Sequence, residues 1–139
     1  MIYESLQQAV EALEKLEKSR AAYTHALGLL ELDAASTAPS ESWEGRSITI
    51  GVLSEAMYNL ISDEKNAAML ACLQEHAQEL DAVTRRKAEV IAKEYNQLNR
   101  IPADEYIAYT VLLNDAQAVW EKAKNADDFS LFQPSLEGT

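Results

Sequence analysis

The sequence predicts an all-α protein built from antiparallel helical hairpins. Apolar residues recur at steps of three and four along most of the chain, which is the spacing of one helix face. No stretch of useful length alternates with the period of two that a half-buried strand would show. With 4 Gly and 3 Pro in 139 residues, the chain also lacks the turn residues that an all-β fold needs. We expect four long helices and one short helix, packed as a bundle in a single domain over residues 1–139.

The first long helix is expected from about residue 3 to 31. Its apolar stripe, which Arg20 interrupts once, consists of Leu6, Ala9, Leu13, Leu16, Tyr23, Leu27 and Leu30. The segment EALEKLEKSR within it is rich in strong helix formers. The pattern ends at DAASTAPSES, where Asp33 either orders the loop after the helix or is a solvated loop carboxylate.

The second helix is expected to be WEGRSITIGVLSEAMYNLI, residues 43–61, with Ser42 as its N-cap. Its apolar stripe comprises Ile50, Leu53, Met57, Leu60 and Ile61. Gly45 and Gly51 weaken this helix, and a glycine within a helix indicates close packing more often than a function.

A short third helix follows SDEKN, with Ser62 or Asp63 as its cap, and a fourth helix follows it. The short helix carries Met69, Leu70 and Leu73. We favour a break near residues 78–81 over one continuous helix, with Asp81 capping the fourth helix from Val83 to Asn99. The apolar face of the fourth helix consists of Ala88, Ile91, Tyr95 and Leu98.

Pro102 separates the fourth helix from a last long helix, ADEYIAYTVLLNDAQAVWEKAKN, residues 103–125. Acidic residues at its start and lysines at its end suit the helix dipole. One stripe of this helix is expected to be core and consists of Tyr106, Tyr109, Leu113 and Trp120. Trp43 is likewise expected to be a core or interface anchor, because a tryptophan buries a large area.

The chain ends FSLFQPSLEGT, which has the pattern of a helix start. Ser130 and Gln133 have the spacing of a capping box, and Phe129 stands where a hydrophobic staple would place it. This segment is either a frayed tail or the first turn of a helix that a longer relative continues.

Charge and cysteine content restrict the classes of partner and the compartment. The chain carries 12 basic and 23 acidic residues, a net charge of -11, so nucleic acid and anionic membranes are not expected as partners. Cys72 is the one cysteine, which rules out an internal disulfide and favours a small core residue. The first twenty residues carry charges throughout and have the pattern of neither a signal peptide nor a membrane span. We therefore expect a cytoplasmic protein.

A search for catalytic motifs gives no candidate catalytic, cofactor-binding or metal-ligating residue. Neither His25 nor His76 belongs to an H-E-x-x-H motif or to the E-x-x-H pair of a di-iron bundle. Each histidine is expected to serve packing or to face solvent. No phosphate-binding G-x-x-x-x-G-K-[ST] loop is present. The chain alone is therefore not expected to catalyse a reaction.

Three stretches together resemble the N-terminal region of the carboxypeptidase Taq family of metal-dependent carboxypeptidases. They are LGLLELDAASTAPSESWEGRSITIGVLSEAMYNLISD, LDAVTRRKAEVIAKEYNQLNRIPADEYIAY and AQAVWEKAKNADDFSLFQPSLE. The resemblance runs in order from about Tyr23 to Glu137. Its most specific pieces are the motif around Asp33 and Pro39, the spacing from Arg46 to Leu53 and the run from Ala116 to Leu136. One position departs from it, because Leu32 stands where the family usually has tryptophan.

The resemblance implies a zinc (or cobalt-like divalent metal) peptidase that removes C-terminal residues and is built from helices around a deep groove. The H-E-x-x-H motif and the other active-site residues of that family lie beyond the region that matches. The matched helices would wall or cap the groove, which is a scaffold role. The resemblance also favours the interpretation that the C-terminal segment is the first turn of a helix that continues in longer relatives.

Three hypotheses remain open. The chain is an inert N-terminal piece of such a carboxypeptidase, or a stand-alone helical interaction module, or, least favoured, a peptidase with an unrecognised site. In the first two, an exposed apolar stripe contacts the rest of the peptidase or forms a homo-oligomer. An in-frame continuation past Thr139 that encodes H-E-x-x-H would favour the first over the second. Stoichiometric zinc and release of C-terminal amino acids would favour the third.

Overall fold

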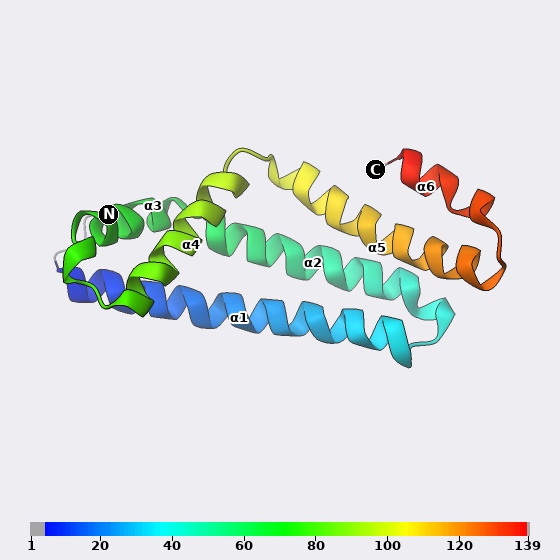
Figure 1. The fold of residues 1–139 in the computed structure, drawn as a ribbon, viewed down its shortest axis with the longest axis horizontal. Helices are drawn as coiled ribbons and strands as arrows, with labels where there is room; N and C mark the ends of the chain where they lie inside the picture. The colour runs from blue at the N-terminus through cyan, green and yellow to red at the C-terminus, as the bar shows by residue number, and fades with distance from the viewer. Residues whose placement is uncertain (1–4, 139) are drawn as a thin grey trace. The chain divides into compact units, whose positions relative to one another are not determined.

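The computed structural model describes residues 5–138 and is helical, with no strand in that range. The predicted all-α class is confirmed, and Figure 1 shows the path of the chain. The α-helices are α1 (Leu6–Ser36), α2 (Trp43–Ser62), α3 (Glu64–Glu75), α4 (Ala82–Leu98), α5 (Ala103–Asn125) and α6 (Gln133–Glu137). Short 3-10 turns occupy Ser40–Ser42, Ala77–Glu79 and Phe129–Leu131. The described part thus contains the four long helices and the short one that were expected, together with the short α6. None of its helices is both long enough and apolar enough to cross a membrane.

The helix α1 ends five residues later than its apolar pattern predicts, at Ser36 instead of 31. In its last turn the Ser36 hydroxyl donates to the Leu32 carbonyl oxygen at 2.6 Å. The Asp33 carboxylate accepts the Thr37 hydroxyl at 2.7 Å, and its backbone carbonyl accepts the N–H groups of Thr37 and Ala38. Asp33 therefore orders the end of α1, the first of the two alternatives. The expected start at residue 3 lies outside the described residues.

Aspartates cap two helices as the sequence predicts. Asp81 accepts the backbone N–H groups of Val83 and Thr84, both at 3.0 Å, and the Thr84 hydroxyl at 2.6 Å. The bond from the Thr84 hydroxyl contributes most to lowering the pKa of Asp81, and the backbone N–H groups add to it. Asp63 caps α3 through the Lys65 N–H at 2.9 Å, whereas Ser62 belongs to α2 and donates to the Tyr58 carbonyl. The expected break before Asp81 is present as the turn Ala77–Glu79.

Two predicted serine caps are wrong, because both hydroxyls donate a hydrogen bond to a neighbouring oxygen instead of accepting one from a helix N–H. Ser42 donates to the Pro39 carbonyl at 2.6 Å, within the 3-10 turn that precedes α2. Ser130 donates to the Asp128 carboxylate at 2.6 Å, and Asp128 itself accepts the Ser130 N–H. Gln133 bonds forward to Glu137 at 2.8 Å and does not close a capping box.

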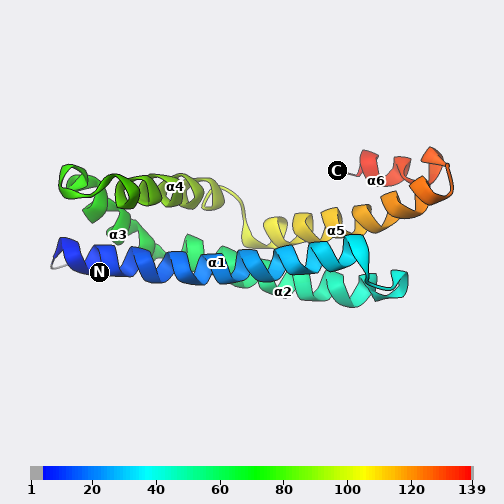
Figure 2. The ribbon, with the colours of Figure 1, turned by 60° about the horizontal axis from the view of Figure 1, so that its bottom comes forward.

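The turn that ends α5 contains the one non-glycine residue with positive φ in the described chain. Asp127 has φ 51, and the Asp128 N–H donates back to the Ala123 carbonyl at 3.0 Å. This is the left-handed geometry that closes many helix ends. It turns the chain so that α6 folds back beside the end of α5, as Figures 1 and 2 show.

The chain divides into two compact units, each assembled from separate segments of the sequence. Unit 1 comprises the described residues of Met1–Thr24 together with Ala56–Pro102. Its core contains Ala9, Leu13, Leu16, Met69, Leu70, Leu73, Leu80 and Ile91. Cys72 is half-buried beside this core, as expected for a small structural cysteine. Ala9, Leu13 and Leu16 of the predicted α1 stripe and the predicted short-helix residues are therefore confirmed as buried, whereas Leu6 is half-buried beside them.

Unit 2 comprises His25–Glu55 and the described residues of Ala103–Thr139. Its helices α2 and α5 approach closely at Gly51, where an added Cβ would lie 3.4 Å from a Val111 methyl group. This agrees with the prediction of close packing at that glycine. At Gly45 the prediction fails, since an added Cβ would meet nothing within 4 Å.

Candidate functional site

The two histidines lie in different units of the chain. His25 is exposed on α1, in unit 2, and His76 lies at the end of α3, in unit 1, with its Nδ1 2.9 Å from the Cys72 carbonyl oxygen. Across residues 5–138, no group of three or more His, Cys, Asp or Glu side chains is arranged to hold a metal ion. His76 thus has the structural contact that was expected of a histidine on these helices.

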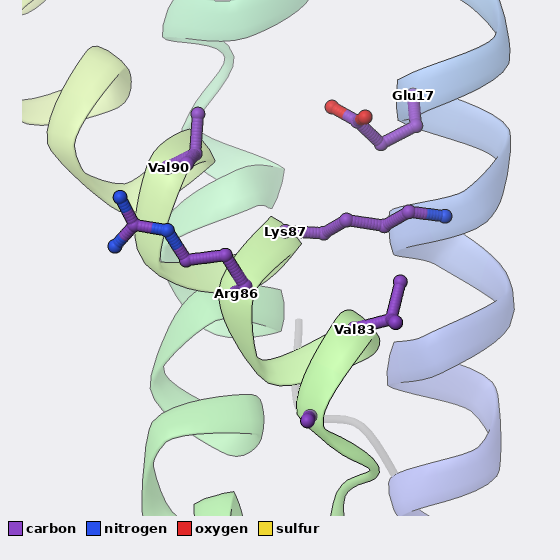
Figure 3. A pocket seen from close by; sticks show the side chains of 6 residues that line it. Glu17, Val83, Arg86, Lys87 and Val90 are labelled. Carbon is purple, nitrogen blue, oxygen red and sulfur yellow. The ribbon is translucent and has the colours of Figure 1, made fainter.

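A groove of about 410 Å³ runs along α4 in unit 1, opposite Glu17 of α1 (Figure 3). The residues that line it are Glu17, Ala82, Val83, Arg86, Lys87 and Val90. Val83 and Val90 lie two helical turns apart on α4 and form its apolar floor, with 64% and 39% of their surfaces exposed. Sequence reasoning missed this groove, because it assigned Val83 only as the start of a helix.

Charged side chains flank the apolar floor of the groove. Figure 3 shows Lys87 extending toward α1 and Arg86 pointing to the other side. Arg86 pairs with the exposed Glu89 at 2.9 Å, while Lys87 has no ion-pair partner among the described residues. On α1, Glu17 lies 3.8 Å from Arg20, which is held mainly by Glu94 of α4 at 2.8 Å. That partly buried Arg20–Glu94 pair fixes α1 against α4 and so shapes the groove.

A smaller hollow of about 80 Å³ lies in unit 2. It is lined by Ala34, Ala38, Pro39, Ser40, Trp43, Arg46, Ala118, Glu121, Lys122 and Asn125. Trp43 is half-buried there, in keeping with its expected role as an anchor. Arg46 donates from Nη1 to the Ser42 hydroxyl at 3.2 Å, and its Nε is buried without a hydrogen-bond partner.

The expected core stripe of α5 is largely wrong. Tyr106 is half-buried, but Tyr109, Leu113 and Trp120 are 50%, 44% and 42% exposed. We call these three residues the α5 apolar row. Trp120 packs edge-on against Phe132, with ring centroids 5.3 Å apart, and the remainder of the row faces outward. The opposite side of α5 faces α2.

A buried polar contact joins α2 to α5 in unit 2, and sequence reasoning missed it as well. Ser47 is 6% exposed, and its hydroxyl donates to the Asp115 carboxylate at 2.5 Å and accepts from the Asn114 side-chain amide. A serine within a helix carries no sequence signal for such a partner, since the partners lie 67 and 68 residues away. The contact fixes how the two helices face each other within this unit.

Comparison with known proteins places this helical fold among metallopeptidases. The chain belongs to the Carboxypeptidase Taq (M32) metallopeptidase family, whose family model matches residues 12–139. It is 35% identical over 115 residues to Carboxypeptidase 1 of Bacillus subtilis (strain 168), a match that covers 83% of this chain and 23% of that protein. Its fold is similar to the BsuCP crystal structure, with a TM-score of 0.84 and 31% identity over 96% of this chain and 26% of that one.

The chain thus spans about a quarter of the length of these relatives. The resemblance to the carboxypeptidase Taq family is confirmed, and the family match begins eleven residues before Tyr23, at residue 12. A metallopeptidase implies a bound metal, and the described residues do not fit one. The His76 Nδ1 lies beside a backbone carbonyl oxygen, and neither histidine belongs to a group of three or more metal-ligating side chains among the described residues.

Proposed function

We propose that this chain is an N-terminal helical scaffold segment of a metal-dependent carboxypeptidase that releases C-terminal amino acids from peptides. In this proposal the segment walls or caps the peptide-binding groove. The zinc or similar divalent metal is held by other parts of the polypeptide, and the 139 residues do not catalyse the reaction by themselves. The proposed compartment is the cytoplasm.

The observation that carries the proposal is the extent of the match. The family model covers residues 12–139, and the same region corresponds to 23% of Carboxypeptidase 1. The sequence contains no H-E-x-x-H, the motif by which zinc peptidases place two histidines and a glutamate on one helix face. The core cluster of unit 1 consists of Ala, Leu, Met and Ile side chains, which supports a scaffold role over a catalytic one.

A segment exchange tests the scaffold role in a whole enzyme. Residues 12–139 replace the matching region of Bacillus subtilis Carboxypeptidase 1, and kcat/KM is measured on a peptide with a free C-terminus. The exchanged enzyme is expected to keep its metal content and peptidase activity. A second exchange that carries Ile61→Asp, at a fully buried position, is expected to lose both with its fold. A folded, metal-loaded exchange that is inactive would refute the scaffold role.

The non-catalytic part of the proposal has its own test. The 139-residue chain is incubated with zinc and the same peptide, and released amino acids are quantified by mass spectrometry. No release above the blank is expected, together with less than stoichiometric zinc after gel filtration. Release that depends on His25 or His76 would overturn this part and leave the family assignment intact.

A second candidate function is a stand-alone protein-interaction module. The observation that favours it is the exposed α5 apolar row, which lies in the same unit as the exposed Phe129, Leu131 and Leu136. Exposed apolar groups in this number on one unit favour a protein contact, which for a stand-alone module is a second copy of the chain and for a peptidase segment is the rest of the peptidase. Sedimentation over a range of concentrations separates the two, because a shift in mass that Leu113→Lys abolishes supports self-association.

A further inference from the structure

The groove along α4 coincides with the most basic segment of an acidic chain. The helix α4 carries four basic residues (Arg85, Arg86, Lys87 and Lys93) against two acidic residues (Glu89 and Glu94). Every other α-helix in residues 5–138 carries more acidic than basic side chains. The apolar floor formed by Val83 and Val90 therefore lies on a helix whose charge is opposite to the net -11 of the chain.

From this we propose that the α4 groove binds an acidic amphipathic helix of a partner protein. Val83 and Val90 are seven residues apart, which is about 10 Å along a helix and matches two turns of a bound helix. The aliphatic stripe of the partner packs on these valines. Its carboxylates lie beside Lys87 on one edge of the floor and Arg86 on the other.

The charges around the floor determine where the partner helix can carry acidic residues. Lys87 extends toward α1 without an ion-pair partner among the described residues, so a carboxylate beside it meets an uncompensated cation. Arg86 already contacts Glu89, but both side chains are well exposed, and such pairs exchange partners at little cost. Glu17 stands on the α1 edge and disfavours a carboxylate directly opposite it. The acidic positions of the partner are thus restricted to the α4 edge, beside Arg86 and the stem of Lys87 and away from Glu17.

Long-range repulsion does not cancel this local attraction. At physiological ionic strength the Debye length is about 8 Å, so a helix seated in the groove interacts mainly with α4 and little with distant acidic residues. An anionic membrane or nucleic acid presents charge over a far larger area and meets the acidic remainder of the chain. The groove therefore fits a narrow acidic ligand better than an extended anionic surface.

The probe for the test is a synthetic helical peptide with leucines at i, i+3 and i+7 and glutamates on both flanks. Two control peptides have the same leucines, one with lysine in place of every glutamate and one with a central proline that breaks the helix. Isothermal titration calorimetry with the 139-residue chain is expected to show binding of the acidic helix and at least about tenfold weaker binding of each control. Equal binding of all three peptides would overturn the proposal.

Matched variants locate the binding to the groove. Val83→Asp and Lys87→Glu are each expected to weaken binding of the acidic helix about tenfold, the first through lost apolar contact and an added negative charge, the second through reversed charge. Val83 stands in the first turn of α4, where an aspartate is compatible with the helix dipole, so the variant is expected to fold. The controls are Val52→Asp, whose parent valine is 61% exposed, and Lys65→Glu on α3. Both are expected to leave binding within about twofold, with circular dichroism confirming helicity.

Three further outcomes would overturn the assignment. In the first, Lys65→Glu weakens the acidic helix as much as Lys87→Glu, which would mean unspecific charge attraction. In the second, the chain binds phosphatidylserine vesicles and Lys87→Glu abolishes this, which would make the occupant a membrane. In the third, the chain self-associates and Val83→Asp abolishes this, which would make the occupant a second copy.

Discussion

Replacement of Trp120 by alanine measures how far the C-terminal turn is packed onto α5. The indole is 42% exposed and so 58% buried, and its ring packs edge-on against Phe132 at 5.3 Å. Loss of a fully buried tryptophan costs about 3–5 kcal/mol, and scaling by the buried fraction gives about 2–3 kcal/mol. The edge-on ring pair contributes about 0.5–1.5 kcal/mol of this.

Urea unfolding followed by circular dichroism is the assay for Trp120→Ala. The free energy of unfolding is expected to fall by about 2–3 kcal/mol with little change in the slope against urea. Trp120→Phe is the control, since it keeps a ring beside Phe132, and it is expected to cost less than half as much. A loss below about 0.5 kcal/mol for the alanine variant would show that the contact with Phe132 does not stabilise the chain. A loss above about 4 kcal/mol that depends on protein concentration would show that the indole is buried between copies.

Three further substitutions test the core, a cap and a glycine. Leu13→Ala is expected to cost about 2–5 kcal/mol in urea unfolding, since Leu13 is fully buried, whereas Leu29→Ala on the same helix, 55% exposed, is expected to stay under about 1 kcal/mol. Asp81→Ala is expected to lower Tm at neutral pH, and the difference from wild type should vanish in acid. The pKa of Asp81 is lower in the folded chain than in the unfolded chain, so the ionised carboxylate stabilises the fold at pH values above the unfolded pKa. This stabilisation is lost as the pH falls below about 4 and passes through the folded pKa. A difference in Tm that persists unchanged at pH 2 would contradict this. Gly45→Ala is expected to stabilise the chain by about 0.5–1 kcal/mol, because nothing lies within 4 Å of the added Cβ, and Gly51→Ala is expected to gain less because Val111 lies 3.4 Å away.

The helices were predictable because their signals are local. The three-and-four spacing located α1 to α5, and aspartate side chains that accept helix N–H groups marked the starts of α3 and α4. The serine caps failed for an equally local reason. The spacing of Ser130 and Gln133 fits a capping box, but Asp128, two residues earlier, accepts the Ser130 N–H and hydroxyl instead.

The burial of α5 was not predictable from periodicity, because its apolar residues cover more than one face. Ile107, Val111 and Val119 are half-buried, while Leu113 and Trp120 are exposed. Which face turns inward depends on the neighbouring helices, and within unit 2 the contact of Ser47 with Asn114 and Asp115 turns the other face toward α2. Sequence spacing carries no information on that choice.

The α4 groove could not be predicted from the sequence either, because it depends on tertiary packing. The run TRRK shows where positive charge gathers, but it does not show that Glu17, 66 residues before Val83, forms the opposite edge. Packing brings Glu17 opposite α4, through the Arg20–Glu94 pair and the core beneath it.

The two units differ in which natural reporter groups they contain. Both tryptophans, Trp43 and Trp120, belong to unit 2, and the single thiol, Cys72, belongs to unit 1. Intrinsic fluorescence therefore follows the melting of unit 2, while the rate at which Cys72 reacts with a disulfide reagent follows the opening of unit 1. Unlabelled, unmutated protein can thus reveal whether the two halves lose their structure in one step or in succession.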